Sequence, residues 1–469
     1  MKKLSFLFLI LGMFACQQAP QKKAPNILIL HADQWRAQAF GYAGDPNVKT
    51  PNFDAFAARS ANFPLAVSGM PVCTPHRASL LTGQRSLTNG IFMNDVQLDT
   101  NAVSLAEVLA KEGYKTGYIG KWHLDGMGRS DFIPPGARRQ GFQYWKALEC
   151  THNYNKSAYY EGDDPEKKFW EGYDTFSQTK DAQAFLKDQA HSEVPFFLML
   201  SWGTPHAPYH TAPESYRALY DSAEIILRPN VPESRQGKAR KDLAGYYAHC
   251  TAIDDMLQEI LQTLKENGLD KDTYVLFTSD HGDLIGSQDA YKKQQAYEES
   301  IRVPMLIAGP GIEVGEYKAL FNSEDIMPSL LGLAGVDVPD FVEGYNYGDL
   351  MKGGEGPIDT ATVISCIQPF GQWNRQKYGG REYRGLRTLR YTFARDLEGP
   401  WLLFDNHEDP YQLHNLVGES EHQELVDKLD DLLSQKLKAY RDEFLPGLSY
   451  VKQYGYPELN EWETVPYRN

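Results

Sequence analysis

The sequence predicts an α/β protein with a mostly parallel central sheet flanked by helices, followed by a smaller antiparallel sheet with a packed helix. Two observations predict the larger unit. Short continuous apolar runs are typical of strands buried on both faces of a sheet, and patterns of apolar residues at helical spacing lie between these runs. A third observation predicts the smaller unit: the tail has closely spaced strand patterns, followed by leucines at helical spacing.

The apolar runs lie at 26–31, 196–200, 274–277 and 303–307. We expect all four to be buried parallel strands. The helical patterns between them include 105–109 and 253–264. Strands that alternate with helices imply a mostly parallel sheet covered by helices.

The tail has strand patterns at 385–394 and 401–404, which predict a hairpin or meander, and leucines at helical spacing over 425–437. The glycine-rich stretch 353–357 favours a boundary there. We therefore expect a catalytic domain over 26–355 and a C-terminal subdomain over 356–469.

Composition excludes several classes of protein. The chain has 469 residues, with 47 Lys and Arg against 62 Asp and Glu, for a net charge of −15. This charge argues against nucleic-acid binding, and a mean hydropathy of −0.49 argues against a polytopic membrane protein. An anionic substrate stays compatible, because an acidic protein can carry a local basic pocket.

The N-terminus resembles a bacterial lipoprotein signal. Lys2 and Lys3 precede the apolar stretch 4–14, which is too short to span a bilayer. Residues 1–16 would be the signal, with Cys16 as the lipidated residue, and 17–25 a linker. The alternative is an ordinary signal peptide. Either interpretation predicts export, and the first predicts a periplasmic or outer-membrane lipoprotein that touches the membrane only through its lipid.

The five cysteines are too widely spaced to form a disulfide framework. We expect three of them, Cys150, Cys250 and Cys366, to be buried as small apolar residues.

Two of the apolar runs end in side chains that can bind metal. Asp33 and Gln34 follow the first run, and Asp280 and His281 follow the third. Ligands bind at the carboxyl ends of strands in such sheets. Oxygen ligands suit Ca²⁺ or Mg²⁺, and one imidazole also admits Mn²⁺. Either pair alone is typical of a turn, but two pairs at equivalent strand ends favour a metal site.

The segment from Cys73 to Gly83 carries the strongest signal. Pro75 favours a helix start and Gly83 a helix end, so Cys73 would sit at a helix N-terminus, where the dipole stabilises anions. A cysteine there is either a simple buried residue or a thiolate of low pKa.

This segment closely resembles the recognition pattern of the sulfatase family, Cys-x-Pro-x-Arg followed by Leu-Thr-Gly. Further matching motifs occur in family order at 26–33, 50–54, 117–123, 204–208, 293–304 and 403–413. The resemblance implies an alkaline phosphatase-like fold. It also implies that a formylglycine-forming maturation enzyme oxidises Cys73 to an aldehyde, whose hydrate attacks sulfur with one hydroxyl and releases sulfate through the other.

The resemblance implies roles for named residues. It assigns one Ca²⁺, with Mg²⁺ or Mn²⁺ as alternatives, to Asp33, Gln34, modified Cys73, Asp280 and His281. Many relatives have Asp where this chain has Gln34, and some phosphate and phosphonate ester hydrolases share Gln.

The implied catalytic residues surround the modified cysteine. Arg77 would hold its hydroxyl, Lys121 would bridge that hydroxyl and sulfate, and His123 would be the base. His206 and Lys293 would bind sulfate and protonate the leaving oxygen.

Two features bear on the substrate. His152 and Asn153 lie in a polar, aromatic segment that suits a sugar ring, although loop packing explains each alone. The run from Arg375 to Arg395 is basic and would guide a polyanionic glycan or form a charged strand face.

We therefore expect an exported sulfatase that acts on a sulfated carbohydrate, with a galactose or N-acetylhexosamine sulfate preferred. One alternative is a phosphodiester or phosphonate monoester hydrolase. The other is a glycan-binding lipoprotein in which Cys73 stays unconverted.

Overall fold

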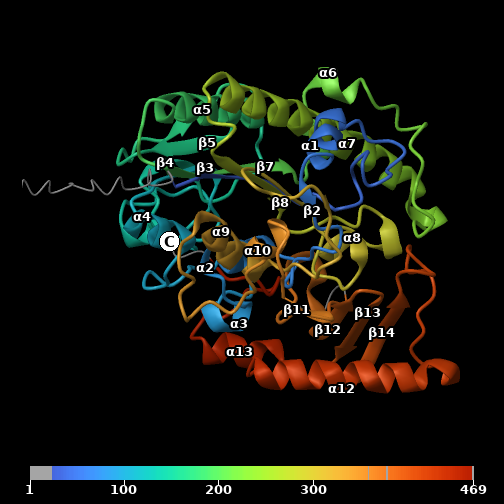
Figure 1. Cartoon of the computed structure of the whole chain (residues 1–469). Coiled ribbons are helices and arrows are strands. Elements are labelled where there is room, and N and C mark those ends of the chain that lie inside the picture. Colours follow the sequence, from blue (N-terminus) through green and yellow to red (C-terminus); the bar gives the residue numbers. More distant parts are fainter. Residues whose placement is uncertain (1–23, 358, 376–378, 467–469) are drawn as a thin grey trace, which may run out of the picture.

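The computed structural model describes residues 24–357, 359–375 and 379–466, so the expected signal with Cys16 lies outside the described residues. In this part of the chain, one sheet has ten strands in the order β10-β2-β9-β8-β1-β7-β3-β4-β5-β6, and a second has four in the order β11-β12-β13-β14 (Figure 1). The architecture agrees with the predicted fold class. Among the described helices, none is long and apolar enough to span a bilayer.

Five adjacent strands of the large sheet run parallel: β8 (Thr273–Ser279), β1 (Asn26–Asp33), β7 (Phe196–Pro205), β3 (Lys115–Lys121) and β4 (Tyr144–Leu148). Every residue of β1, β7 and β8 is buried. These three strands confirm the first three apolar runs. The sequence pattern missed β3, because glycine and polar residues interrupt its apolar positions.

The two edges of the large sheet contain antiparallel pairs. The fourth apolar run forms β9 (Met305–Ala308), which pairs antiparallel with β8. The expectation of a parallel strand there was wrong, because burial predicts apolar residues but not strand direction. The other edge strands are β2 (Ala61–Asn62), β10 (Gly315–Glu316), β5 (Ala158–Glu161) and β6 (Lys168–Phe169).

Helices cover both faces of the large sheet, because side chains of β1 alternate between them. Ile27 and Ile29 pack into a core with α2 (Cys73–Thr82), α4 (Leu105–Lys111) and α9 (Ile326–Ala334). Leu28 and Leu30 face the opposite core. That core contains α1 (Pro51–Ala57), α5 (Asp174–Gln189) and the long α7 (Glu233–Glu266).

The remaining elements of this part are short. The helices are α3 (Ser86–Asn89), α6 (Glu214–Arg217), α8 (Glu298–Ile301) and α10 (Gly348–Met351). Single 3₁₀ turns lie at Ala137–Arg139, Tyr209–Thr211, Ser287–Asp289, Ser323–Asp325, Gly371–Trp373 and Ser420–His422.

The small sheet is an antiparallel meander of β11 (Ala361–Cys366), β12 (Tyr383–Thr388), β13 (Tyr391–Asp396) and β14 (Gly399–Asp405), as the tail pattern predicted. Helix α12 (Gln423–Ala439) covers one face with Leu429, Leu433 and Leu437. The chain then returns to the large domain, where α13 (Gly447–Gln453) and Val465 join the core under α2 (Figure 1).

The basic run from Arg375 to Arg395 is a charged strand face and not a free cationic surface. Each of its described arginines has a carboxylate partner: Arg375 with Glu382 and Glu463, Arg381 with Asp396, Arg384 with Asp442, Arg387 with Glu298, Arg390 with Asp405, and Arg395 with Asp430. Lys377 lies outside the described residues. Because these charges are paired, the structure does not support the expected guidance of a polyanion.

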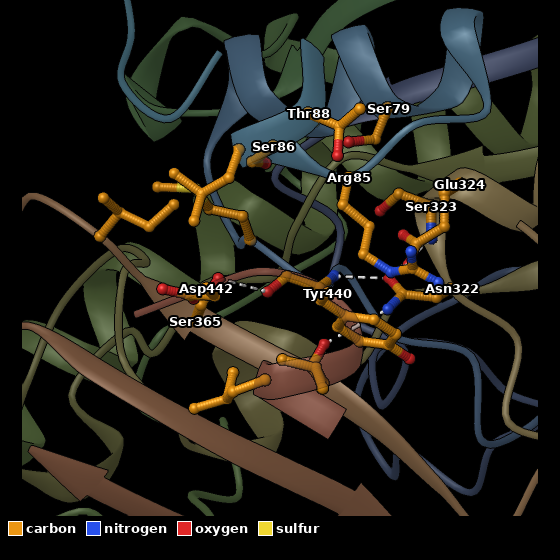
Figure 2. A pocket seen from close by; sticks show the side chains of 16 residues that line it. Ser79, Arg85, Ser86, Thr88, Asn322, Ser323, Glu324, Ser365, Tyr440 and Asp442 are labelled. Carbon is orange, nitrogen blue, oxygen red and sulfur yellow. Dashed lines mark hydrogen bonds and ion pairs between the residues drawn. The ribbon is translucent and has the colours of Figure 1, made fainter. Parts of the chain in front are cut away.

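A small cavity of about 60 Å³ lies between α2 and α3 of the large domain and β11 and the end of α12 in the C-terminal part (Figure 2). Arg85, the residue before α3, reaches across it and places its guanidinium carbon 3.6 Å from the ring centroid of Tyr440, the residue after α12. Arg85 also lies 3.4 Å from a carboxylate oxygen of Glu343. This contact joins the C-terminal helix to the large domain by a cation–π interaction.

We expect Arg85→Ala to destabilise the protein by about 1–2 kcal/mol, because a partly desolvated cation–π contact is lost. Thermal unfolding measures the effect. Arg59→Ala is the matched control, since the exposed Arg59 lies 5.5 Å from the ring of Phe56 and should contribute little. Equal melting temperatures for the two variants would contradict the prediction.

Burial of Asp174, in the first turn of α5, makes stability depend on pH. Its Oδ1 is buried without a hydrogen bond from the described residues, and burial raises its pKa to about 7. Because this pKa lies above the unfolded value, the stabilisation is complete below about pH 4 and is lost as the pH rises through 7. Relative to wild type, the melting temperature of Asp174→Asn should therefore rise by a few degrees from pH 5 to pH 8. A constant difference across that range would refute this.

Candidate active site

The candidate site lies where the carboxyl ends of β8, β1, β7 and β3 meet. These four strands are neighbours in the sheet. Asp33 ends β1 and Lys121 ends β3, while Asp280 and His206 follow β8 and β7 directly. Parallel strands bring their last residues to one edge of the sheet. The residues that motif spacing singled out separately therefore form one buried cluster.

Cys73 enters this cluster as the first residue of α2. Val72 before it is extended, and Gly83 ends the helix in the left-handed conformation with φ of 65°. The Cys73 sulfur lies 3.2 Å from His281 Nε2, 3.5 Å from Lys293 Nζ and 3.9 Å from Asp33 Oδ1. The bounds of α2 confirm the predicted placement of Cys73 at a helix N-terminus.

The electrostatic surroundings favour an anion at Cys73. Burial and the Asp33 carboxylate act to raise the pKa of its thiol. The ammonium groups of Lys121 and Lys293 outweigh them and hold that pKa well below its usual value.

Four side chains can hold a cation beside Cys73. Ligand atoms of Asp33, Cys73, Asp280 and His281 are all buried and lie within 4.8 Å of one another. His281 Nδ1 lies 2.9 Å from the Gly282 carbonyl oxygen, to which it donates, so Nε2 keeps its lone pair toward the cluster. Two carboxylates, a sulfur and an imidazole therefore fit a divalent cation.

Gln34, the fifth ligand that the resemblance predicts, lies next to this donor set, since its N–H donates to Asp280 Oδ1 at 2.9 Å. Its Nε2 donates to Asp283 Oδ2 at 2.5 Å, and its Oε1 accepts from Lys293 Nζ at 3.1 Å. Tyr209 also donates to Asp283, which fixes the position of that carboxylate. The amide is thereby oriented with its oxygen toward the cluster, the orientation that a hard cation needs.

Arg77 balances the charge of the carboxylates. Its Nη2 lies 3.2 Å from Asp33 Oδ2 and 3.1 Å from Asp280 Oδ2, and Nη1 donates to Ser201 Oγ at 2.7 Å. Both carboxylates are fully buried, and a buried charge without a partner is costly. Arg77 Nη1 also donates to the Lys121 carbonyl oxygen at 2.9 Å. Among the described residues no hydrogen bond joins Arg77 to Cys73, so its expected contact with modified Cys73 stays a prediction.

Lys121 and His123 line the other side of Cys73. Lys121 Nζ lies 2.5 Å from Asp33 Oδ2. His123 Nε2 lies 3.1 Å from Asp95 Oδ1, and its Nδ1 is buried without a partner among the described residues. Burial opposes protonation of His123, but the nearby Cys150 and the hydrogen bond to Asp95 raise its pKa to about 9.

His206 and Lys293 form a second pair above Cys73. His206 Nδ1 faces its neighbouring carbonyl at 2.8 Å, so Nε2 accepts from Lys293 Nζ at 3.2 Å. Burial and the Lys293 ammonium hold the pKa of His206 well below its usual value. Because His206 is neutral and Lys293 is charged, a proton can be transferred along the hydrogen bond from Lys293 Nζ to His206 Nε2.

Of the two expected sugar contacts, His152 and Asn153, only His152 lines the pocket. His152 stacks on His206, with ring centroids 4.5 Å apart, and lines the pocket above Cys73. Asn153 is exposed and does not line that pocket, so its expected contact with a sugar stays a prediction. Adjacent residues in an extended loop point to opposite sides, which the polar sequence pattern could not resolve.

Sequence reasoning missed several supporting residues. Asp95 holds His123, Asp283 and Tyr209 orient Gln34, and Ser201 holds Arg77. Only Asp283 carried a signal, because it lies within the motif that contains Asp280. The others support a neighbour by hydrogen bonds that no local pattern encodes.

A sheet of this topology, with a cysteine of lowered pKa at a helix N-terminus and a candidate cation site at its strand ends, is typical of an alkaline phosphatase-like hydrolase. Comparison with known families narrows this class. The model described as "Sulfatase" matches residues 25–336, and "N-sulphoglucosamine sulphohydrolase, C-terminal" matches 286–439. The chain therefore belongs to the sulfatase family and is a sulfuric ester hydrolase.

Individual relatives agree with this assignment. The chain is 44% identical to an ulvan-active sulfatase from Formosa agariphila, over 96% of this chain and 88% of the relative. It is 31% identical to an endo-4-O-sulfatase from Bacteroides thetaiotaomicron, over 91% and 94% of the two chains. A solved Bacteroides fragilis structure named as a sulfatase superimposes with a TM-score of 0.82 at 28% identity, over 93% and 99%.

We expect Asp95→Asn to lower kcat for sulfate release by about 10–100-fold, because His123 loses the carboxylate that orients it. Loss of the Asp95 carboxylate also lowers the pKa of His123 in the variant. For a base, this shift moves the acid limb of the pH–rate profile to lower pH. Asp99→Asn, an exposed change in the same loop, is the control. An unchanged kcat and profile would exclude Asp95 from this role.

Proposed function

We propose that this protein is an exported sulfatase that releases sulfate from a sulfated polysaccharide or its oligosaccharides, using a formylglycine made from Cys73 and a divalent cation. The observation that carries the proposal is the cluster of Lys121, Lys293 and two histidines around a cysteine of lowered pKa. The names of the relatives that act on ulvan and as an endo-4-O-sulfatase support a glycan.

Each cationic group has a defined task in this proposal. Lys121 and Lys293 bind the oxygens of the sulfate ester and stabilise the charge that develops on them. Lys293 Nζ and His206 Nε2 lie 3.2 Å apart and share a proton that can be donated to the leaving oxygen. In its neutral form His123, held by Asp95, takes a proton from the modified Cys73 to let the product leave. Because the pKa of His123 is about 9, this neutral form increases as the pH rises toward that value.

The formylglycine and the divalent cation would each supply one kind of chemistry. A hydrated formylglycine supplies a hydroxyl nucleophile and a second hydroxyl for sulfate release. A divalent cation held by Asp33, Gln34, Cys73, Asp280 and His281 would lower the pKa of that hydroxyl. Ca²⁺ is the ion proposed, because oxygen ligands predominate in this set.

The proposal also includes the preferred sugar and the route of export. A galactose or N-acetylhexosamine sulfate remains the preferred sugar, and lipid anchoring through Cys16 remains the preferred route to the periplasm or outer membrane. Both suit an enzyme that meets a large glycan outside the cytoplasm. A maturation enzyme that oxidises Cys73 is the one protein partner proposed.

A phosphodiester or a phosphonate monoester is the second candidate substrate, and Gln34 is the observation that favours it. An amide at this position removes one negative charge from the cluster. A phosphodiester and a phosphonate monoester each carry one negative charge at neutral pH, as a sulfate monoester does, so net charge alone does not separate the candidates. The rates of sulfate and phosphate release from matched esters therefore separate the two candidates.

The proposal is tested by coexpression with a formylglycine-forming enzyme and assay of sulfate release from ulvan, sulfated monosaccharides, glycosaminoglycans and matched phosphate esters. We expect sulfate release in the presence of Ca²⁺, and loss of at least 1,000-fold in Cys73→Ala, because the nucleophile is removed. Cys250→Ala, which removes another buried cysteine, is the control and should stay active.

Peptide mass spectrometry reports whether Cys73 was converted. Conversion without sulfate release from any of these substrates would refute the proposed function. Faster release of phosphate than of sulfate would favour the second candidate.

A further inference from the structure

The pocket above Cys73 contains more positive charge than one sulfate ester requires. It encloses about 180 Å³, and Lys121, Lys292, Lys293 and Arg129 all line it. Lys293 Nζ lies 3.5 Å from the Cys73 sulfur, where the scissile sulfate would bind, and Lys121 Nζ lies beside Asp33, which also contacts that sulfur. The other two cations lie on the same pocket but have no task in the reaction proposed above.

Three of these four cations have hydrogen-bond or ion-pair partners within the protein. Lys121 pairs with Asp33, and Lys293 contacts Gln34 and His206. Arg129 makes a two-point contact with Asp95, with Nε 3.1 Å from Oδ1 and Nη2 2.8 Å from Oδ2. In the described part of the chain, no hydrogen bond or ion pair reaches the ammonium of Lys292.

The backbone explains why two consecutive lysines line the same pocket. Lys292 has φ of 66°, in the left-handed region that lysine rarely adopts. Its N–H donates to Asp283 Oδ1 at 2.8 Å, which holds this conformation. Residues in a regular strand would point to opposite sides, so the kink brings Lys292 to the side of Lys293.

Asp283 does not neutralise Lys292. Its Oδ1 accepts the N–H groups of Lys292 and Ile285, and its Oδ2 accepts from Gln34 and Tyr209. Both oxygens are thus occupied, and neither is within ion-pair distance of the ammonium. Burial and the nearby Lys293 charge accordingly lower the pKa of Lys292.

A half-buried ammonium among other cations is unfavourable unless an anion joins it. The scissile sulfate already has Lys121, Lys293 and His206 around it. A second anionic group on the same substrate, next to the sulfated sugar position, would satisfy Lys292 from the pocket side. On a glycan such a group is a uronic acid carboxylate or a second sulfate ester.

We propose that Lys292 forms a subsite for a second anionic group of the substrate, so that this sulfatase prefers glycans that carry a carboxylate or another sulfate beside the ester it cleaves. The proposal rests on the proposed function and narrows its substrate class. Lys292 is then a specificity residue, because it contacts substrate at a distance from the reacting sulfur.

The test compares Lys292→Gln with wild type on matched substrates. One pair is a disaccharide with one sulfate ester and one uronic acid, and its carboxyl-reduced form. The other pair is a disulfated and a monosulfated monosaccharide. We expect kcat/KM of the variant to fall about tenfold, through KM, on the member of a pair with two anionic groups. On the members with one anionic group it should change less than twofold.

The pair that responds identifies the source of the anion. Lys292→Arg keeps the charge and should retain most of the preference. Lys271→Gln is the matched control, since this exposed lysine precedes β8 at the opposite edge of the sheet. Equal losses on both members of each pair, or no loss on any substrate, would overturn the subsite.

A binding measurement separates failure of the subsite from failure of the proposed function. The affinity of Cys73→Ala for the same compounds, with and without Lys292→Gln, is measured by calorimetry and does not need turnover. Binding that depends on Lys292 without sulfate release would overturn only the proposed function. Sulfate release with binding that ignores Lys292 would overturn only the subsite.

Discussion

The buried carboxylate of Asp33 is the group on which the rest of the site depends. It is fully buried at the end of the central strand, where an unpaired charge would cost several kcal/mol. Lys121 and Arg77 come to it from β3 and α2, and both ion pairs are buried as well. Burial alone would raise the pKa of Asp33, but Lys121 and the other nearby cations hold it well below its usual value.

This charge balance ties the fold to the chemistry. Because Lys121 and Arg77 must both reach Asp33, the end of β3 and the first turn of α2 are fixed beside β1. The same requirement places Cys73 within reach of Lys293 and His281. A site assembled from loops alone would lack these constraints, since loops are the most mobile parts of a fold. The parallel strands provide rigid positions, and the ion pairs select one arrangement of the side chains.

The sequence predicted the central strands and the chemistry at their ends, because continuous apolar runs and motif spacing are local signals. It predicted β9 in the wrong direction, since direction depends on the connection and not on apolar content. It assigned the arginines of 375–395 no partners, because Asp442 and Glu298 lie far from them in sequence. It missed Asp95 for the same reason. Long-range hydrogen bonds and ion pairs carry no pattern that one sequence reveals.

Gln34 shows how one neutral side chain changes the charge that a substrate meets. With a carboxylate at this position, the Lys293 ammonium would form an ion pair, and part of its charge would be neutralised. The amide oxygen accepts the same hydrogen bond at 3.1 Å but carries no net charge. His206, the other partner of Lys293, is held neutral by burial and by that same ammonium. The positive charge of Lys293 therefore stays directed toward the pocket, where it and the neighbouring Lys292 attract an anion together.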